Sequence, residues 1–322
     1  MNLALLRSML MLFAALSSGA LAAQEAAEAA PVKRIALSFD DTPRFEGALY
    51  SDDERSIRLI AALHDGGVKQ AAFFINPGRL SEKPGGKARI AAYVAAGHVI
   101  ANHTFSHPQL RSMDTQEYVN DIARAAEWLN GRKGYRPWFR FPFLDEGGDD
   151  KEKRDAIRGA LDRFQLRNGY VTIDASDWFF DAELSKAKRA GKPINMVALK
   201  ELFVESHLGA AAAYDGIAMD TLGRSPAHIM LLHESDLTVL ALPDLIQALK
   251  ADGWEFITAD EAYADPIAKE MPDVPFSQGT IIEMMAWERG MPAPRWYERN
   301  NTRIAGKLFR ELVLNETSRP KE

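Results

Sequence analysis

Short apolar runs alternate with longer amphipathic segments along most of this 322-residue chain. The runs have the length of strands, and the segments between them repeat apolar residues at helical spacing. Glycines such as Gly66, Gly97 and Gly253 stand where a helix should stop before the next strand. We predict strands at residues 34–39, 71–75, 98–101, 138–141, 170–173, 228–232 and 254–257. We predict helices at residues 53–64, 87–95, 115–129, 150–164, 196–214 and 242–251.

Strands that alternate with helices form parallel βαβ units. About seven such units favour an α/β fold with a closed or nearly closed barrel over an open sheet. Polar residues lie at or just after the C-terminal ends of five of the predicted strands, the face on which β/α barrels build active sites. We therefore expect these residues to converge in space: Asp40, His103, Arg140, Asp174 and His233.

The first residues have the features of a secretory signal peptide. Arg7 precedes an apolar run at residues 9–16, and Ala20-Leu21-Ala22 fits a cleavage site. An uncleaved membrane anchor is the alternative, but the run is short for a span. We predict export to the periplasm or the medium, with no stable membrane anchor after cleavage.

Composition narrows the class of protein further. The chain has no cysteine, which excludes disulfides and thiolate metal ligands. Its net charge of −6 and the lack of a Lys/Arg-rich stripe argue against nucleic-acid binding. An exported protein of this composition depends on its apolar core for stability.

Two segments do not fit the strand–helix repeat. An insertion at about residues 179–224 is predicted to form a substrate wall on the active-site face. The tail contains Trp287, Trp296 and Tyr297 and a predicted helix at residues 302–314. We expect the tail to pack on the barrel, and the alternative is a sugar-stacking surface. The predicted organisation is a signal peptide (1–23), a linker (24–32), a catalytic domain (33–264) and a C-terminal extension (265–322).

His103 and His107 are four residues apart, about one helical turn, which suits the chelation of one metal ion. Taken alone, the pair could equally be two hydrogen-bonded surface histidines. A carboxylate at the end of an earlier strand favours a metal site over surface histidines. Two histidines and one carboxylate leave an open position for water, as in catalytic zinc sites.

Asp40 and Asp41 are adjacent at a strand end, so their side chains should point in different directions. One can bind metal while the other acts as a general base; a solvated turn through Thr42-Pro43 is the alternative. His233 follows a strongly apolar strand and should emerge at the barrel rim, where the alternative is a core histidine. We assign structural roles to the other histidines: His64, His98, His207 and His228.

Five ordered motifs resemble those of the polysaccharide deacetylase family, the NodB-homology domain of carbohydrate esterase family 4. The resemblance covers residues 33–264 and implies a distorted (β/α)7 barrel of the glycoside hydrolase/deacetylase type. The sequence departs from the family pattern at Thr42-Pro43, Phe143, Leu144 and Glu234. The motifs are Phe39-Asp40-Asp41, His103-Thr104-Phe105-Ser106-His107, Arg140-Phe141-Pro142-Phe143, Asp174 to Trp178, and Leu231-Leu232-His233-Glu234.

The resemblance also implies a role for each site residue. Asp41, His103 and His107 would bind one divalent metal ion, usually zinc, with cobalt or a similar ion as the alternative. Asp40 would be the general base and His233 the general acid. The supporting roles would be as follows: Arg140 holds Asp40, Asp177 orients His233, Trp178 and Leu231 line the pocket for the acetyl methyl group, and the backbone N–H of Phe143 stabilises the oxyanion.

These roles predict metal-dependent hydrolysis of the N-acetyl amide of N-acetylglucosamine residues, with release of acetate. The partner would be an N-acetylated polysaccharide or oligosaccharide: a chitooligosaccharide, peptidoglycan or an exopolysaccharide. One alternative keeps the metal site but hydrolyses acetyl esters, as on xylan, or a small non-sugar amide. A third interpretation is a non-catalytic glycan-binding domain. The sequence does not choose among the glycans and does not give the oligomeric state.

Overall fold

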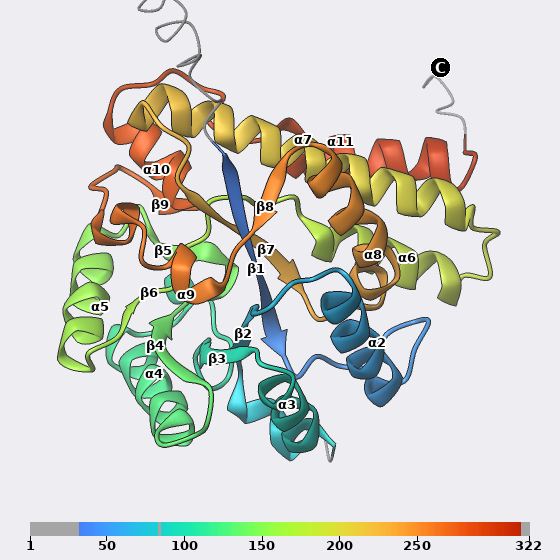
Figure 1. The fold of residues 1–322 in the computed structure, drawn as a ribbon. Coiled ribbons are helices and arrows are strands. Elements are labelled where there is room, and N and C mark those ends of the chain that lie inside the picture. Colours follow the sequence, from blue (N-terminus) through green and yellow to red (C-terminus); the bar gives the residue numbers. More distant parts are fainter. Residues whose placement is uncertain (1–31, 83–84, 317–322) are drawn as a thin grey trace, which may run out of the picture. The chain divides into compact units, whose positions relative to one another are not determined.

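A parallel β-sheet lies at the centre of the computed structural model, which describes residues 32–82 and 85–316 (Figure 1). Within these residues the sheet has seven strands: six pair in the order β6-β4-β3-β2-β1-β7, and β8 pairs with the first residues of β1. The strands are β1 (Lys33–Thr42), β2 (Ala72–Ile75), β3 (Val99–Asn102), β4 (Tyr135–Phe139), β6 (Arg167–Asn168), β7 (Ala227–His233) and β8 (Trp254–Phe256).

The sheet curls until its two edges meet. β6 forms one edge and β7 the other. The chain just after β6 makes a single parallel bridge from Ile173 to Met230 in β7. The predicted α/β fold with a nearly closed barrel of parallel strands is therefore confirmed.

The strand predicted at residues 170–173 is wrong as a regular strand, because Ile173 alone pairs there. The Arg140 guanidinium donates to the carbonyl oxygens of Gly169 and Tyr170, at 2.7 and 3.4 Å. The hydroxyl of Tyr263 also donates to the Tyr170 carbonyl. The carbonyl oxygens of Gly169 and Tyr170 thus accept hydrogen bonds from side chains and not from a neighbouring strand.

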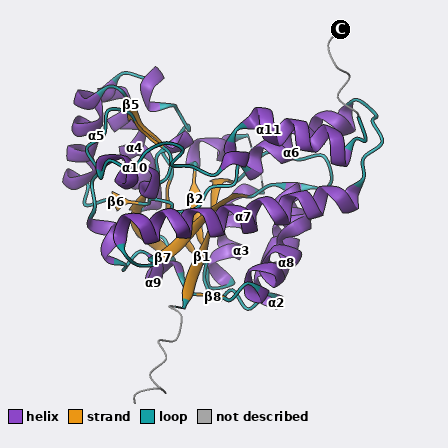
Figure 2. Ribbon diagram, turned by 90° about the horizontal axis from the view of Figure 1, so that it is seen from above, coloured by secondary structure: helices purple, strands orange, loops and turns teal. Residues whose placement is uncertain are grey.

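Helices lie around the central strands (Figure 2). α4 has the predicted bounds, and the Asp114 side chain accepts hydrogen bonds from the backbone N–H groups of Gln116 and Glu117. The helices are α2 (Asp52–Asp65), α3 (Gly86–Ala95), α4 (Thr115–Leu129), α5 (Lys151–Arg163), α6 (Asp177–Arg189), α7 (Met196–Leu222), α8 (Asp236–Ala251), α9 (Ala259–Ala262), α10 (Ile281–Glu288) and α11 (Thr302–Leu308). Shorter 3-10 or π turns occupy Pro77–Ser81, Leu110–Ser112, Pro142–Leu144, Pro266–Lys269, Glu298–Asn300 and Phe309–Val313.

The excursion between the fifth and sixth predicted strands contains two helices, α6 and α7, where we expected one. α8 begins at Asp236, six residues before the predicted start, and contains Pro243. Proline lacks an N–H and crowds the preceding turn, so it is unfavourable inside a helix. In the structure the buried apolar face that begins at Leu237 extends the helix through it.

The C-terminal extension packs into the same core as the barrel. Ile282 and Met285 of α10 and Phe309 after α11 are fully buried in the hydrophobic cluster that also contains Leu37 and Phe73 of the strands. Burial of this apolar surface holds the extension against the barrel. The domain boundary at residue 264 stays a prediction.

A two-stranded antiparallel ribbon of β5 (Asp145–Gly148) and β9 (Ser277–Gln278) ties the extension to the loop after β4. The predicted signal peptide and nearly all of the linker lie outside the described residues. Among the residues that are described, no helix is both long and apolar enough to cross a membrane.

Candidate active site

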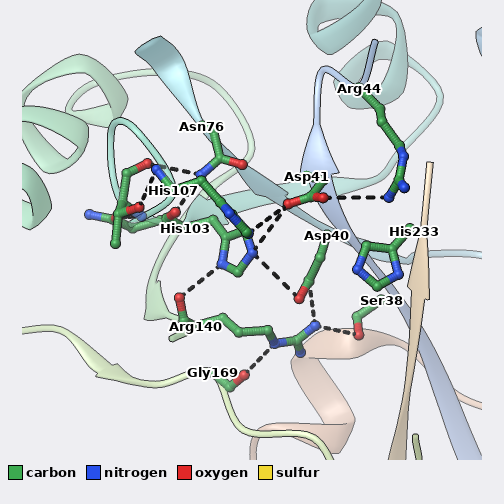
Figure 3. A network of polar contacts seen from close by, with 12 residues as sticks. Ser38, Asp40, Asp41, Arg44, Asn76, His103, His107, Arg140, Gly169 and His233 are labelled. Atoms are coloured by element: carbon green, nitrogen blue, oxygen red, sulfur yellow. Dashed lines mark hydrogen bonds and ion pairs between the residues drawn. The ribbon is translucent and has the colours of Figure 1, made fainter. Parts of the chain in front are cut away.

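Asp40 and Asp41 lie near the end of β1, beside an irregularity in its pairing with β2. Asp41 has a φ of 67°, in the left-handed region that aspartate tolerates better than most residues. This turn separates the two carboxylates, as the sequence predicted. Asp41 faces the histidine pair, whereas Asp40 faces Arg140 (Figure 3).

His103 and His107 converge on Asp41, but they do not lie on a helix. The segment after β3 is a loop in which Thr104 and His107 have φ values of 64° and 61°. The Asn76 amide donates to the carbonyl oxygens of His103 and Thr104, and the Thr104 hydroxyl accepts from the His107 backbone N–H. The prediction of a shared site is supported by the geometry, and the helical reasoning behind it was wrong.

One nitrogen from each histidine and one oxygen of Asp41 lie within 4.8 Å of one another, a spacing that can hold a metal ion. His103 Nδ1 lies 2.9 Å from the carbonyl oxygen of Arg140, so Nδ1 carries the proton. Burial, with the neighbouring His107, lowers the pKa of His103 well below its usual value. The ring is therefore neutral, and its Nε2 lone pair faces the carboxylates of Asp40 and Asp41, at 3.6 and 3.7 Å.

A lone pair facing two carboxylates is electrostatically unfavourable unless a cation lies between them. Burial opposes ionisation of Asp41, but the close approach of His107 and the charge of Arg79 hold its pKa well below the usual range. His107 Nε2 lies 2.8 Å from Asp41 Oδ1. A charged carboxylate and two imidazoles with inward nitrogens fit a divalent ion such as zinc.

Asp40 is buried against a fixed guanidinium. Arg140 Nη1 donates to Asp40 Oδ1 at 2.6 Å and to the Ser38 hydroxyl at 2.9 Å, and the guanidinium carbon lies 3.8 Å from the Phe74 ring centroid. Burial raises the pKa of Asp40, although Arg140 and His233 oppose that change. Asp40 is thus a stronger base than an exposed aspartate and is held in one orientation.

His233 faces Asp40 from the end of β7, on the side opposite the histidine pair (Figure 3). Its Nδ1 lies 2.7 Å from Asp177 Oδ1, while its backbone N–H and the Thr238 hydroxyl donate to Asp177 Oδ2. Burial alone would lower the pKa of His233, but Asp177 outweighs burial and raises it. Asp177 therefore favours the protonated imidazole, the form that a general acid requires.

A pocket of about 630 Å³ opens above these groups. The predicted residues Phe143, Trp178 and Leu231 line it, with the Phe143 ring centroid 4.7 Å from that of His107. Arg140 and Asp177 are each 1% exposed and lie behind Asp40 and His233. Arg140 therefore acts through Asp40, and Asp177 acts through His233.

Several pocket residues were not predicted. Arg44 is one of them, and its guanidinium reaches Asp41 Oδ2 at 3.4 Å. Asp174 also lines the pocket, as expected from its place after a predicted strand, although no role was assigned to it. Glu283 comes from the extension, where Thr280-x-x-Glu283 forms a capping box at the start of α10. That motif is visible in the sequence, but nothing there places it beside the barrel. The extension contributes further lining residues: Gln278, Gly279, Trp296, Asn300 and Asn301.

Glu283 should make stability depend on pH. Burial, helped by the charge of Asp174, raises its pKa from 4.5 to about 7. The folded chain keeps this proton at pH values where the unfolded chain has released it, so stability falls as pH rises from about 4.5 to 7. Glu283→Gln should remove this loss, worth up to about 3 kcal/mol.

Denaturant unfolding at pH 4 and pH 8 checks this prediction. The Gln variant should match the wild-type chain at pH 4 and exceed its stability at pH 8. Glu152→Gln, which alters an exposed glutamate on α5, is the control. An equal pH dependence in the wild-type chain and both variants would show that Glu283 ionises normally.

Comparisons with known proteins agree with the geometry. A model of the polysaccharide deacetylase family matches residues 27–158. The peptidoglycan-N-acetylglucosamine deacetylase PgdA of Listeria monocytogenes is 27% identical over 237 residues, which cover 73% of this chain and 40% of that protein. A peptidoglycan-N-acetylglucosamine deacetylase of Bacillus cereus is 38% identical over 108 residues, or 34% of this chain and 35% of that protein.

The matched region therefore spans about 40% or less of the length of either of these two relatives. Among solved structures, the chitin deacetylase of Colletotrichum lindemuthianum is 19% identical, with a TM-score of 0.49 over 72% of this chain and 88% of that one.

Proposed function

Because this chain belongs to the polysaccharide deacetylase family, we propose that it hydrolyses the N-acetyl amide of N-acetylglucosamine residues in a glycan and releases acetate. One observation carries the proposal. Asp40 lies between the histidine pair and His233, next to the Asp41–His103–His107 cluster (Figure 3). Asp40 and His233 each have a buried, oppositely charged partner, Arg140 and Asp177.

In the proposed reaction Asp40 acts as the general base and His233 as the general acid. A divalent ion, when bound by Asp41, His103 and His107, supplies Lewis-acid polarisation and lowers the pKa of water. Asp40 accepts the proton of the attacking water, and Arg140 keeps the carboxylate in place. His233 then donates its proton from Nε2 to the departing nitrogen, since an amine is a poor leaving group until it is protonated.

The pocket supports an acetylated substrate. Trp178 and Leu231 offer apolar surface to the acetyl methyl group, and the backbone N–H of Phe143 would stabilise the oxyanion. The raised pKa of His233 favours an amide substrate over an ester, because an amine must be protonated before it leaves, whereas an alcohol needs less help from an acid. Hydrolysis of acetyl esters or of a small non-sugar amide at the same site is the second candidate.

The finer assignments belong to the same proposal. Two imidazoles and one carboxylate suit zinc, which we propose as the resident ion. We also propose export to the periplasm or the medium, on the strength of Arg7, the apolar run at residues 9–16 and the Ala-x-Ala site. Alkaline phosphatase fused after residue 32 would be active only if the segment directs export.

A substrate panel tests the function. The purified chain with zinc or cobalt should release acetate from N-acetylated chitooligosaccharides, peptidoglycan fragments or an N-acetylglucosamine exopolysaccharide, and more slowly from acetylxylan. Faster release from acetylxylan would favour the esterase alternative. Metal binding without acetate release from any glycan in the panel would overturn the proposal.

Asp177→Asn should narrow the pH range of activity. The general acid must carry its proton, so kcat/KM falls as pH rises through the pKa of His233, which Asp177 holds above its ordinary value. Without that charge the pKa falls, and the alkaline limb should move to lower pH by about one unit or more. The pH–rate profile of Asp220→Asn, at an exposed position of α7, is the control. An unmoved alkaline limb would assign it to another group.

A further inference from the structure

The C-terminal extension lines two hollows that adjoin each other. The first is the active-site pocket. The second has a volume of about 350 Å³, and its wall includes Phe276, Met284, Trp287 and Arg295 of the extension. The two hollows adjoin each other, because four residues line both: Gln278, Gly279, Glu283 and Trp296.

Polar contacts fix the boundary between the hollows. The Gln278 amide donates to the carbonyl oxygen of Phe143, and its own oxygen accepts from Arg111 at 3.0 Å. On the following residues, the backbone N–H of Thr280 donates to Glu283 Oε2, which fixes the start of α10. β9 pairs with β5, and α10 follows β9 in the chain (Figure 1). These elements therefore fix the positions of the residues that line both hollows.

Three of the eight residues that line the second hollow are aromatic: Phe276, Trp287 and Trp296. Phe276 and Trp296 are 37% and 46% exposed, a high fraction for side chains of this size. The guanidinium of Arg295 lies 4.6 Å from the ring centroid of Trp287, which leaves a planar cation at the same wall. Pyranose rings have an apolar C–H face that packs on aromatic rings and a rim of hydroxyls that hydrogen-bond polar side chains.

We propose that this second hollow binds a sugar ring of the same glycan chain, next to the residue being deacetylated. The inference rests on the proposed function and adds the length of substrate that the site recognises. Aromatic walls suit the sugar faces, while Gln278, Glu283 and Arg295 suit the hydroxyl groups. Its volume lies within the range of about 300–1,000 Å³ typical of small-molecule sites.

Binding of chitin oligomers of two to six N-acetylglucosamine units tests the proposal. The measurement is isothermal titration calorimetry on the full zinc-loaded chain carrying Asp40→Asn, so that the probe is not consumed. Affinity should rise with oligomer length until the second hollow is filled. Adding Trp287→Ala should weaken binding of the long oligomers by about five- to tenfold and leave the dimer unchanged.

Two matched controls keep the test specific. Trp128 on α4 resembles Trp287, because it is partly buried and the guanidinium of Arg132 lies 3.6 Å from its ring centroid. Trp128 lines a different hollow, so Trp128→Ala should not change oligomer binding. Phe276→Ala should weaken long oligomers, whereas Phe164→Ala, at another phenylalanine that is 37% exposed, should not. Equal affinity for all lengths, or equal losses in variant and control, would overturn the inference.

Binding and turnover also separate this inference from the proposed function. Length-dependent binding that Trp287→Ala removes, in a chain that releases no acetate, would support the second hollow and contradict the proposed function. Acetate release from wild-type chain with a kcat/KM that neither oligomer length nor Trp287→Ala changes would overturn the second hollow alone.

Discussion

Asp40→Asn is expected to lower kcat/KM for acetate release by about 10²–10⁴-fold. Asparagine keeps the shape of aspartate and can still accept from Arg140 Nη1, which lies 2.6 Å from Asp40 Oδ1. It cannot take a proton from the attacking water at neutral pH. The loss should therefore appear in kcat, measured by acetate release from a chitin oligomer, while the folded structure is retained.

Metal content distinguishes a lost base from a lost site. The Asp40→Asn chain should bind one ion with nearly the wild-type affinity, because the proposed ligands are Asp41, His103 and His107. Asp162→Asn, at an exposed position of α5, should change neither activity nor metal content. Activity within a few-fold of wild type in Asp40→Asn would remove the residue from the proposed chemistry.

His107→Ala is expected to weaken zinc binding by at least about 100-fold and to abolish turnover at stoichiometric metal. Loss of one of three protein ligands should cost more than the 10–100-fold typical of a lost supporting contact. His107 is a better choice than His103, which is buried and bonded to the Arg140 carbonyl. The measurement is zinc titration by calorimetry, followed by acetate release at the same zinc concentration.

His64→Ala is the matched control, because His64 is an exposed histidine at the end of α2. It should bind zinc and turn over substrate like the wild-type chain. Unchanged zinc affinity in His107→Ala would show that the ion binds elsewhere, and the assignment of the cluster would fail.

The sequence predicted the strands that carry the site and the order of the site residues. Asp40, Asp41 and His233 end long apolar runs, and such runs form buried strands whatever surrounds them. Their convergence follows from parallel pairing, in which β7 lies directly beside β1 and Asp40 pairs with His233. These features depend on local composition and on strand direction, which a sequence displays.

The structural features that the sequence did not predict depend on contacts with residues elsewhere in the chain. β5 consists of Asp145-Glu146-Gly147-Gly148, which has the composition of a turn and becomes a strand only beside β9. The loop of residues 103–107 takes its shape from Asn76 and Asp121, which lie far from it in sequence. Glu283 enters the pocket because α10 packs on α7, a contact that no local pattern encodes.

The most direct test of the central claim is a metal titration of the metal-free chain with acetate release as the readout. With an N-acetylated chitin oligomer as substrate, the rate should rise in proportion to added zinc and level off at one ion per chain. Full activity in the metal-free chain, or no acetate release at any occupancy of the site, would contradict the account.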